Sequence, residues 1–233
     1  MVESVQQETS REIEGMKQQA ERDANALNLV YRQLNPSPEL PAIAQDKLDE
    51  ALRLASRSVR VQAFNKAWRV RADNWRDSES KGKMALTIPI FRALIHNDPD
   101  DQYHMNHGQL GFALKDKAPP AWEEAKAELS TAIRIRGDWR EKGWLYYEFA
   151  RAVCRIMLDS GYLAGKASAS DAREAILADL QAALHAEDIR NILTQTPEAG
   201  PEPYASQAES TAAVIDQWLA QNHLNKSKLL AGK

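Results

Sequence analysis

The sequence holds few residues whose types and spacing suit chemistry. His104 and His107 lie three positions apart, and Asp98 and Asp100 precede them closely, so these side chains are the strongest metal-ligand candidates. A helical metal site of the His-Glu-x-x-His type is absent, however, and Cys154 is the single cysteine. We therefore interpret both histidines as structural or surface residues and predict no metal site.

The segment at residues 161–167, with the sequence GYLAGKA, superficially resembles a phosphate-binding loop. It lacks the spacing of such loops, the Ser or Thr that follows their lysine, and a preceding strand, so we interpret it as a connection between helices. The order of residues along the chain offers no Ser-His-Asp or paired-carboxylate arrangement. We therefore expect a protein that is not an enzyme and that needs no cofactor.

The composition favours helices over strands. The 233 residues include 36 Ala but 8 Val and 6 Thr, and Ala is the best helix former whereas β-branched residues favour sheets. No apolar run approaches the roughly 20 residues of a membrane helix, and the polar start is unlike a secretory signal. The sequence therefore predicts an all-α protein, and we expect it in the cytoplasm without a membrane span.

Prolines and small polar residues divide the chain into three parts. Residues 1–41 contain a polar helix at 3–34 whose apolar residues, among them Ile13 and Met16, recur at steps of three and four, which suggests a coiled coil and a homo-oligomer. Residues 42–195 form the main helical domain. Residues 196–233 contain a Pro-rich linker, a capping helix and a tail from residue 225 that we expect to fray. Further helices are expected at about residues 41–58, 60–77, 84–96, 102–115, 121–136, 140–159, 170–186 and 204–222, with Pro89 delaying or kinking the third of these.

The main domain contains a pattern that repeats every 39 residues. Small residues recur at Ala72, Gly111 and Ala150, and a larger apolar residue follows three positions later each time. A small residue lets two helix backbones approach, and the larger one fills the neighbouring groove. The spacing therefore predicts a stack of helix pairs in which Gly111 and Ala150 are close-approach positions.

These residues resemble the tetratricopeptide-repeat family over about residues 60–186. The family's order of small and bulky apolar positions appears first in Trp68, Ala72, Trp75, Ala93 and Pro99, and again in Leu110, Gly111, Leu114, Ala125, Leu129 and Ala132. The resemblance is to a divergent member or another helical repeat. It implies an α-solenoid of antiparallel helix pairs, a right-handed superhelix whose concave groove binds peptides without catalysis.

The same resemblance places a binding surface on the first helix of each repeat. Carried over by the 39-residue offset, the groove would contain Arg69, Arg76, Phe112, Lys115, Tyr147, Arg151 and Arg155. Such a surface is mostly basic with aromatic walls, and arginine offers planar donors to carboxylates. We therefore expect a protein- or peptide-binding scaffold whose partner presents an acidic segment or a chain-terminal carboxylate.

Two other functions remain as alternatives. Seven basic residues and one acidic residue lie between positions 53 and 76, and a stripe of Lys and Arg can bind the phosphates of nucleic acid. A formal charge of −3 and the absence of a recognised nucleic-acid motif place this alternative second. The other alternative is a regulatory or sensor module of a larger system that oligomerises through its N-terminal helix.

Overall fold

The protein is all-helical. The computed structural model describes residues 2–74, 80–98, 100, 102–137, 146–194 and 205–230, and no strand occurs among them. The prediction of an all-α fold is therefore confirmed. Along the chain the helices are α1 (Val2–Leu34), α2 (Gln45–Leu54), α3 (Arg57–Asn74), α4 (Lys81–His96), α5 (His104–Asp116), α6 (Trp122–Arg136), α7 (Tyr146–Leu158), α8 (Ser160–Leu163), α9 (Ser170–Ala183), α10 (Glu187–Thr194), α11 (Ala205–Gln221) and α12 (Lys226–Leu230).

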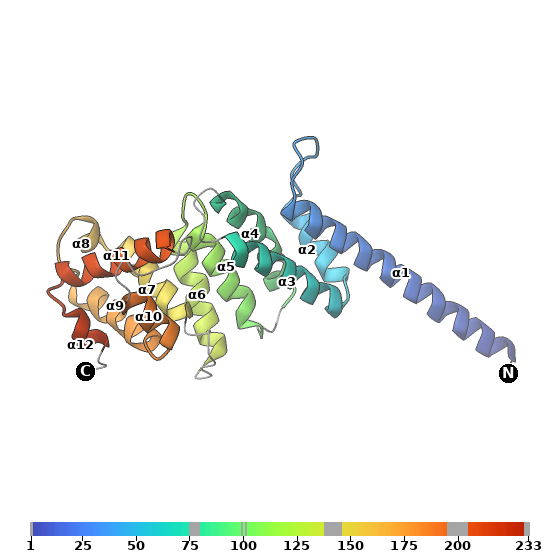
Figure 1. The fold of residues 1–233 in the computed structure, drawn as a ribbon. Coiled ribbons are helices and arrows are strands. Elements are labelled where there is room, and N and C mark those ends of the chain that lie inside the picture. Colours follow the sequence, from blue (N-terminus) through green and yellow to red (C-terminus); the bar gives the residue numbers. More distant parts are fainter. Residues whose placement is uncertain are drawn as a thin grey trace.

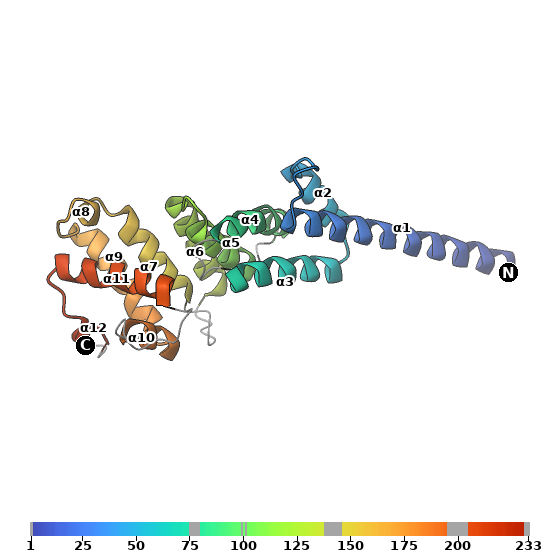
Figure 2. The same ribbon diagram turned by 45° about the horizontal axis from the view of Figure 1, so that its top comes forward.

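The helices follow one another in space in nearly the order of the chain. Each helix from α3 to α6 packs against the next one, and α7 packs against α9. Alternate helices also touch, because α2 contacts α4, α3 contacts α5, and α5 contacts α7. The result is an elongated row with α1 at one end and α9 to α12 at the other (Figures 1 and 2). None of the described helices combines the length and apolar content that a membrane crossing requires.

Helix α7 separates two hydrophobic cores. Tyr147, Ala150 and Cys154 belong to the first core, which is built from α1 to α7. Phe149 and Ile156 belong to the second core, which includes α9 to α12. Apolar residues on both sides of the helix axis therefore let α7 pack against helices on two sides.

The close approach predicted at Gly111 is present. A Cβ atom at this position would lie 2.7 Å from Cγ of Leu129 and 3.3 Å from the carbonyl oxygen of Ala125. Because real Cβ atoms do not come within 3 Å of other heavy atoms, only glycine allows α5 to lie this close to α6. Ala150, the next position in the 39-residue pattern, is also buried.

Several helix boundaries differ from the expected ones. Instead of continuing to residue 58, α2 ends at Leu54, because Ala55 adopts an extended conformation with ψ of 151°. Pro89 does not delay α4, which begins at Lys81 and continues through the proline. The expected loop at residues 160–168 begins with the short helix α8, which the Asp159 carboxylate caps by accepting from the N–H of Gly161 at 3.1 Å.

The C-terminal part contains two helices that the sequence pattern did not predict. Helix α10 places Ile189 and Leu193 in the second core. The prediction that the tail frays from residue 225 is wrong for residues 226–230, which form α12. Leu229 is buried, and the Asn225 side chain accepts from the N–H of Lys228 at 3.2 Å, so both packing and capping hold this short helix. The expected Pro-rich linker at 197–203 lies outside the described residues.

Candidate functional site

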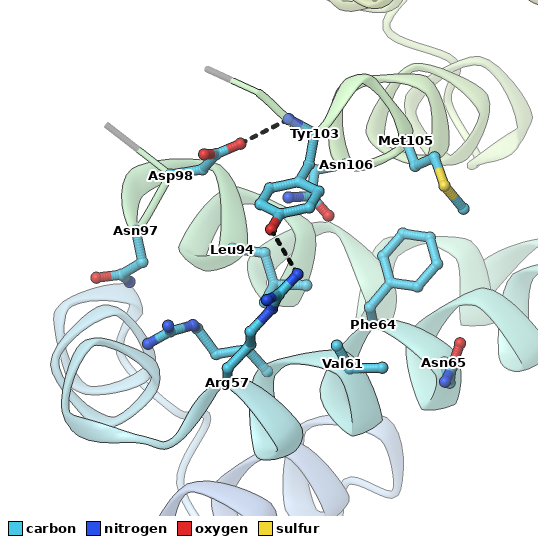
Figure 3. A pocket seen from close by; sticks show the side chains of 11 residues that line it. Arg57, Val61, Phe64, Asn65, Leu94, Asn97, Asp98, Tyr103, Met105 and Asn106 are labelled. Atoms are coloured by element: carbon cyan, nitrogen blue, oxygen red, sulfur yellow. Dashed lines mark hydrogen bonds between the residues drawn. The ribbon is translucent and has the colours of Figure 1, made fainter. Parts of the chain in front are cut away.

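A pocket opens between α3, the end of α4 and the beginning of α5 (Figure 3). Its volume is about 330 Å³, which is within the range of pockets that hold small ligands or single large side chains. We call it the α3–α5 pocket. It is lined by Arg57, Arg60, Val61, Phe64, Asn65, Leu94, Asn97, Asp98, Tyr103, Met105 and Asn106.

Helix α3 carries apolar residues on two sides, and one of these sides is exposed at the pocket. Small residues, Ala63 and Ala67, are buried on the side that packs against the neighbouring helices. Val61 and Trp68 lie two turns apart on the other side and are 51% and 42% exposed. Val61 lines the pocket, and Trp68 extends the exposed apolar surface along α3 beyond it. The helix therefore presents apolar side chains to solvent where a partner can reach them.

Two contacts hold aromatic rings at the pocket. Phe64 packs edge to face on Phe91 of α4, with 5.9 Å between ring centroids. The N–H of Tyr103 donates to the Asp98 carboxylate at 2.8 Å, and the Tyr103 hydroxyl accepts from Arg57 at 3.3 Å (Figure 3). These hydrogen bonds link the end of the α4–α5 connection to α3 and to the beginning of the same connection. Tyr103 is 49% exposed, so its ring forms part of the rim and not of the floor.

The side-chain amide of Asn106 is a polar group in the pocket that the fold itself does not use. Asn106 is 8% exposed, and no hydrogen bond joins its amide to another residue in the described part of the chain. Asn97, also in the pocket lining, donates to the carbonyl oxygens of Asp49 at 3.1 Å and Ala93 at 2.8 Å. The Asn106 amide is not among the fully buried side-chain groups that lack a partner, so its donors and its acceptor are open to water in the pocket.

The charges at the pocket are mainly positive. Arg57 and Arg60 line it, and Asp98 is the one acidic residue among the lining side chains. Arg60 donates one of its guanidinium N–H groups to the carbonyl oxygen of Ala55 at 2.9 Å, which fixes the side chain and leaves other donors. The pocket therefore combines an apolar floor, a buried amide and two guanidinium groups, a set that suits an apolar group next to a carboxylate.

The residues predicted for the groove on α7 have partners within the protein. Tyr147 is 1% exposed, and its ring fills the space left by Gly108, where a Cβ would lie 2.2 Å from Cε1 of the ring. The Tyr147 hydroxyl lies 3.2 Å from Nδ1 of His104. Burial raises the pKa of Tyr147 well above its usual range. Tyr147 thus joins α5 to α7 and does not form an exposed aromatic wall.

Arg151 and Arg155 bind the same buried carboxylate. Asp179 of α9 is 4% exposed and accepts from both arginines, with Nε–Oδ2 distances of 2.9 Å in each case. Arg151 also reaches the hydroxyl of Ser130 on α6 at 3.3 Å. These two predicted groove residues therefore cross-link α6, α7 and α9.

The remaining groove residues are spread over α3 and α5. Phe112 is half-buried against Tyr147, with 5.6 Å between ring centroids. Lys115 pairs with Asp116. Arg69 is exposed on α3 next to Trp68, and Arg76 lies outside the described residues. The structure thus brings Phe112 into contact with Tyr147 and places Arg151 beside Arg155, but each pair already has partners in the fold.

Arg71 was not among the predicted groove residues, yet it occupies the same region. Its guanidinium carbon lies 5.0 Å above the ring centroid of Phe112, and its Nε donates to Gln109 at 2.5 Å. Burial lowers the pKa of Arg71 from its usual value, and Asp116 partly offsets this effect. A cation held over an aromatic ring is a packing contact between α3 and α5.

The two histidines lie at helix contacts. His107 on α5 approaches the Glu128 carboxylate on α6 at 2.6 Å, and both His104 and His107 are 8% exposed. Among the described residues, no group of three or more His, Cys, Asp or Glu side chains is placed to hold a metal ion. The arrangement supports the interpretation of these histidines as packing residues.

Much of the basic stretch at residues 53–76 is engaged in contacts with the protein itself. Arg53 forms an ion pair with Glu50 one turn earlier on α2, and Arg57, Arg60 and Arg71 have the hydrogen bonds described above. Lys66 and Arg69 are exposed on α3. The described part of this stretch therefore still offers exposed cations on α3, although several of its arginines are also held by contacts within the protein.

Sequence reasoning did not find the α3–α5 pocket. Its decisive residue, Asn106, lies between His104 and His107 in a helix that the repeat pattern already explained. The available signal was the pair Val61 and Trp68, two large apolar residues seven positions apart in an otherwise basic helix. Fold and pocket together define an all-helical protein with a partly apolar, partly cationic pocket. No family model matches the chain, and no match was found among curated proteins or among solved structures.

Proposed function

We propose that this protein is a non-catalytic scaffold, similar to tetratricopeptide-repeat proteins, that binds an acidic segment of a protein partner in the α3–α5 pocket. The observation that carries this proposal is the amide of Asn106, which lies in a pocket with an apolar floor and makes no hydrogen bond to another described residue. Such an amide can exchange hydrogen bonds to water for hydrogen bonds to a ligand.

The chemistry of the pocket fits a peptide in three ways. Phe64, Leu94 and Met105 offer apolar surface to one aliphatic or aromatic side chain. An Asn side chain offers two donors and one acceptor, which match the acceptor and donor of a peptide group. Arg57 lies at the rim, where its planar guanidinium can bind a neighbouring carboxylate. The combination selects an apolar anchor with an acid beside it.

The packing order of the helices supports the scaffold part of the proposal. Consecutive helices from α3 to α7 pack against one another, while α3 touches α5 and α5 touches α7. This is the order expected for a stack of helical hairpins, in which the first helices of successive pairs form one surface. The α3–α5 pocket lies between two such first helices, α3 and α5.

A panel of labelled peptides tests the proposal. The fluorescein-labelled 12-residue peptides carry a central Leu, Met, Phe or Trp flanked by glutamates, and a matched set carries lysines instead. We expect at least one acidic peptide to bind below about 100 μM and to shift the methyl NMR signal of Met105, while the lysine versions do not. Loss of binding above 0.5 M salt would accompany this result, because the guanidinium contacts are screened.

The matched variants are Arg57→Glu and Lys66→Glu. Both residues are exposed on α3, but they lie on opposite sides of the helix and only Arg57 lines the pocket. We expect Arg57→Glu to weaken binding at least tenfold and Lys66→Glu to change it less than twofold. Equal binding of acidic and basic peptides, or an equal effect of the two variants, would contradict the proposal. Binding of random-sequence DNA in place of every peptide would support the nucleic-acid alternative.

A further inference from the structure

The N-terminal half of α1, residues 2–20, projects from the rest of the protein, which we call the body; we call this projecting segment the free half of α1. From Gln6 to Gln18 every side chain is exposed, and Gln19 is the first that reaches the body, donating to the carbonyl oxygen of Leu54 at 3.1 Å. Figures 1 and 2 both show this half projecting beyond α2 and α3. Residues 2–20 extend over about 27 Å at 1.5 Å per residue.

One line of residues continues along the whole helix at steps of three and four. In the projecting half it consists of Gln6, Thr9, Ile13, Met16 and Ala20, and its docked part consists of Asp23, Leu27, Val30 and Leu34. Such a 3–4 spacing defines the contact line of a coiled coil. In the docked part, Val30 is fully buried, and Leu27 and Leu34 pack on the first core. The side of α1 that binds the body therefore continues past the body without a partner.

The large apolar side chains of the free half are confined to this line. Ile13 is 44% exposed and Met16 is 65% exposed, whereas the opposite side carries polar residues such as Gln7 and Gln18. Between residues 6 and 20 the helix has three acidic and two basic side chains, so its charge is nearly balanced. A second copy of such a helix is not repelled, whereas a strongly charged partner would have nothing to bind.

We propose that the free half of α1 pairs with the same segment of a second copy of this chain, in antiparallel orientation. The body already occupies the contact line of α1 from residue 23 onward. In a parallel pair the two helices would run side by side past residue 23. Each body would then occupy the space that the partner's helix needs. In an antiparallel pair the two bodies lie at opposite ends, and the partner helix ends where the body begins.

The register follows from the equal length of the two free segments. When residue 2 of one chain lies beside residue 20 of the other, the helices cross near residue 11. Ile13 then faces Thr9 of the partner subunit, and Met16 faces Gln6 of the partner subunit. Two apolar residues per chain against short or flexible polar ones make a weak, reversible dimer, and the opposed helix dipoles favour this orientation.

Sedimentation equilibrium of the full chain tests whether the pair forms. Between 5 and 200 μM we expect the mass to rise from the 26.1 kDa monomer toward twice that value. The double variant Ile13→Asp, Met16→Asp should stay monomeric, and the matched control Gln7→Asp, Gln18→Asp should still dimerise. Both variants should melt like the wild type, because all four side chains are exposed. A monomer at every concentration, or a dimer that survives the Ile13→Asp, Met16→Asp change, would overturn the proposal.

A distance measurement tests the orientation. Asn28 on α1 is exposed, and Cys154 is fully buried, so a spin label added to Asn28→Cys attaches at the surface. The antiparallel pair places the two labels about 50 Å apart along the helix axes, since each is 17 residues from the crossing point. A parallel pair brings them within about 20 Å. A short distance would refute the antiparallel arrangement even if the protein dimerises.

Discussion

Replacing Asn106 by Leu should make the protein more stable while it removes the proposed binding function. Asn106 is 8% exposed and its amide has no hydrogen-bond partner in the described chain. Leu has the branched shape of Asn but a larger volume, and the open pocket leaves room for its methyl groups beside the apolar lining that includes Phe64 and Leu94. The substitution therefore exchanges an amide without a partner in the described chain for an apolar side chain that the pocket floor accommodates.

The size of the gain follows from the apolar area that Leu would bury. Fully burying a Leu side chain contributes about 1.5–3 kcal/mol, and a smaller value applies here because the pocket is open to water on one side. We therefore expect the free energy of unfolding to rise by about 1 kcal/mol. For a chain of this size that corresponds to an increase in melting temperature of about 2–4 °C.

Urea denaturation followed by circular dichroism measures the effect, and Asn97→Leu is the matched control. Asn97 lines the same pocket, but its amide donates to Asp49 at 3.1 Å and to Ala93 at 2.8 Å. Its replacement should lower the free energy of unfolding by about 1–2 kcal/mol, because two part-buried hydrogen bonds are lost and the carbonyl of Asp49 loses this donor. The two substitutions are chemically identical and should have opposite signs.

Binding of the acidic peptides provides the second half of this test. We expect Asn106→Leu to weaken the best peptide at least tenfold, since the peptide group that pairs with the amide would be left unsatisfied. A loss of stability of 1 kcal/mol or more in Asn106→Leu would refute the reasoning, because it would mean that the amide is satisfied in the free protein. Unchanged peptide binding would separately refute its role in recognition.

Four further outcomes are expected. Glu148→Gln should lower the free energy of unfolding by about 3 kcal/mol in urea denaturation, because it leaves Arg136 buried without its bidentate anionic partner. Gly111→Leu should cost about 1–3 kcal/mol by the same measurement, since Leu129 occupies the space of the new side chain; a neutral effect would contradict the close packing of α5 on α6. Deletion of residues 1–20 should change the melting temperature by less than about 2 °C, because side chains 6–18 are exposed and the hydrogen bond from Gln19 to Leu54 is a single part-buried contact. Cys154 should resist a thiol reagent at pH 8 until the protein unfolds, because burial raises its pKa to about 12.

The sequence alone determined the helical class and one packing position of the stack. Abundant Ala and scarce β-branched residues predict helices, and the 39-residue recurrence of small residues singled out Gly111 before any contact was known. Local sequence can do this because helix formation and the period of apolar residues depend on neighbours three and four positions away.

The tertiary structure decided which polar side chains are used up by the fold and which stay free. Arg151 was predicted as a ligand-binding residue, but it pairs with Asp179, which is 28 positions away in the chain. Asn106 was not predicted as a site residue, but it lies in a pocket where no other described residue bonds to its amide. Hydrogen-bond partners of this kind come from helices that are distant in sequence and adjacent in space, and the 3.6-residue period of a single helix carries no information about them. The same Arg or Asn is therefore a structural link or a binding group according to what the neighbouring helix places opposite it.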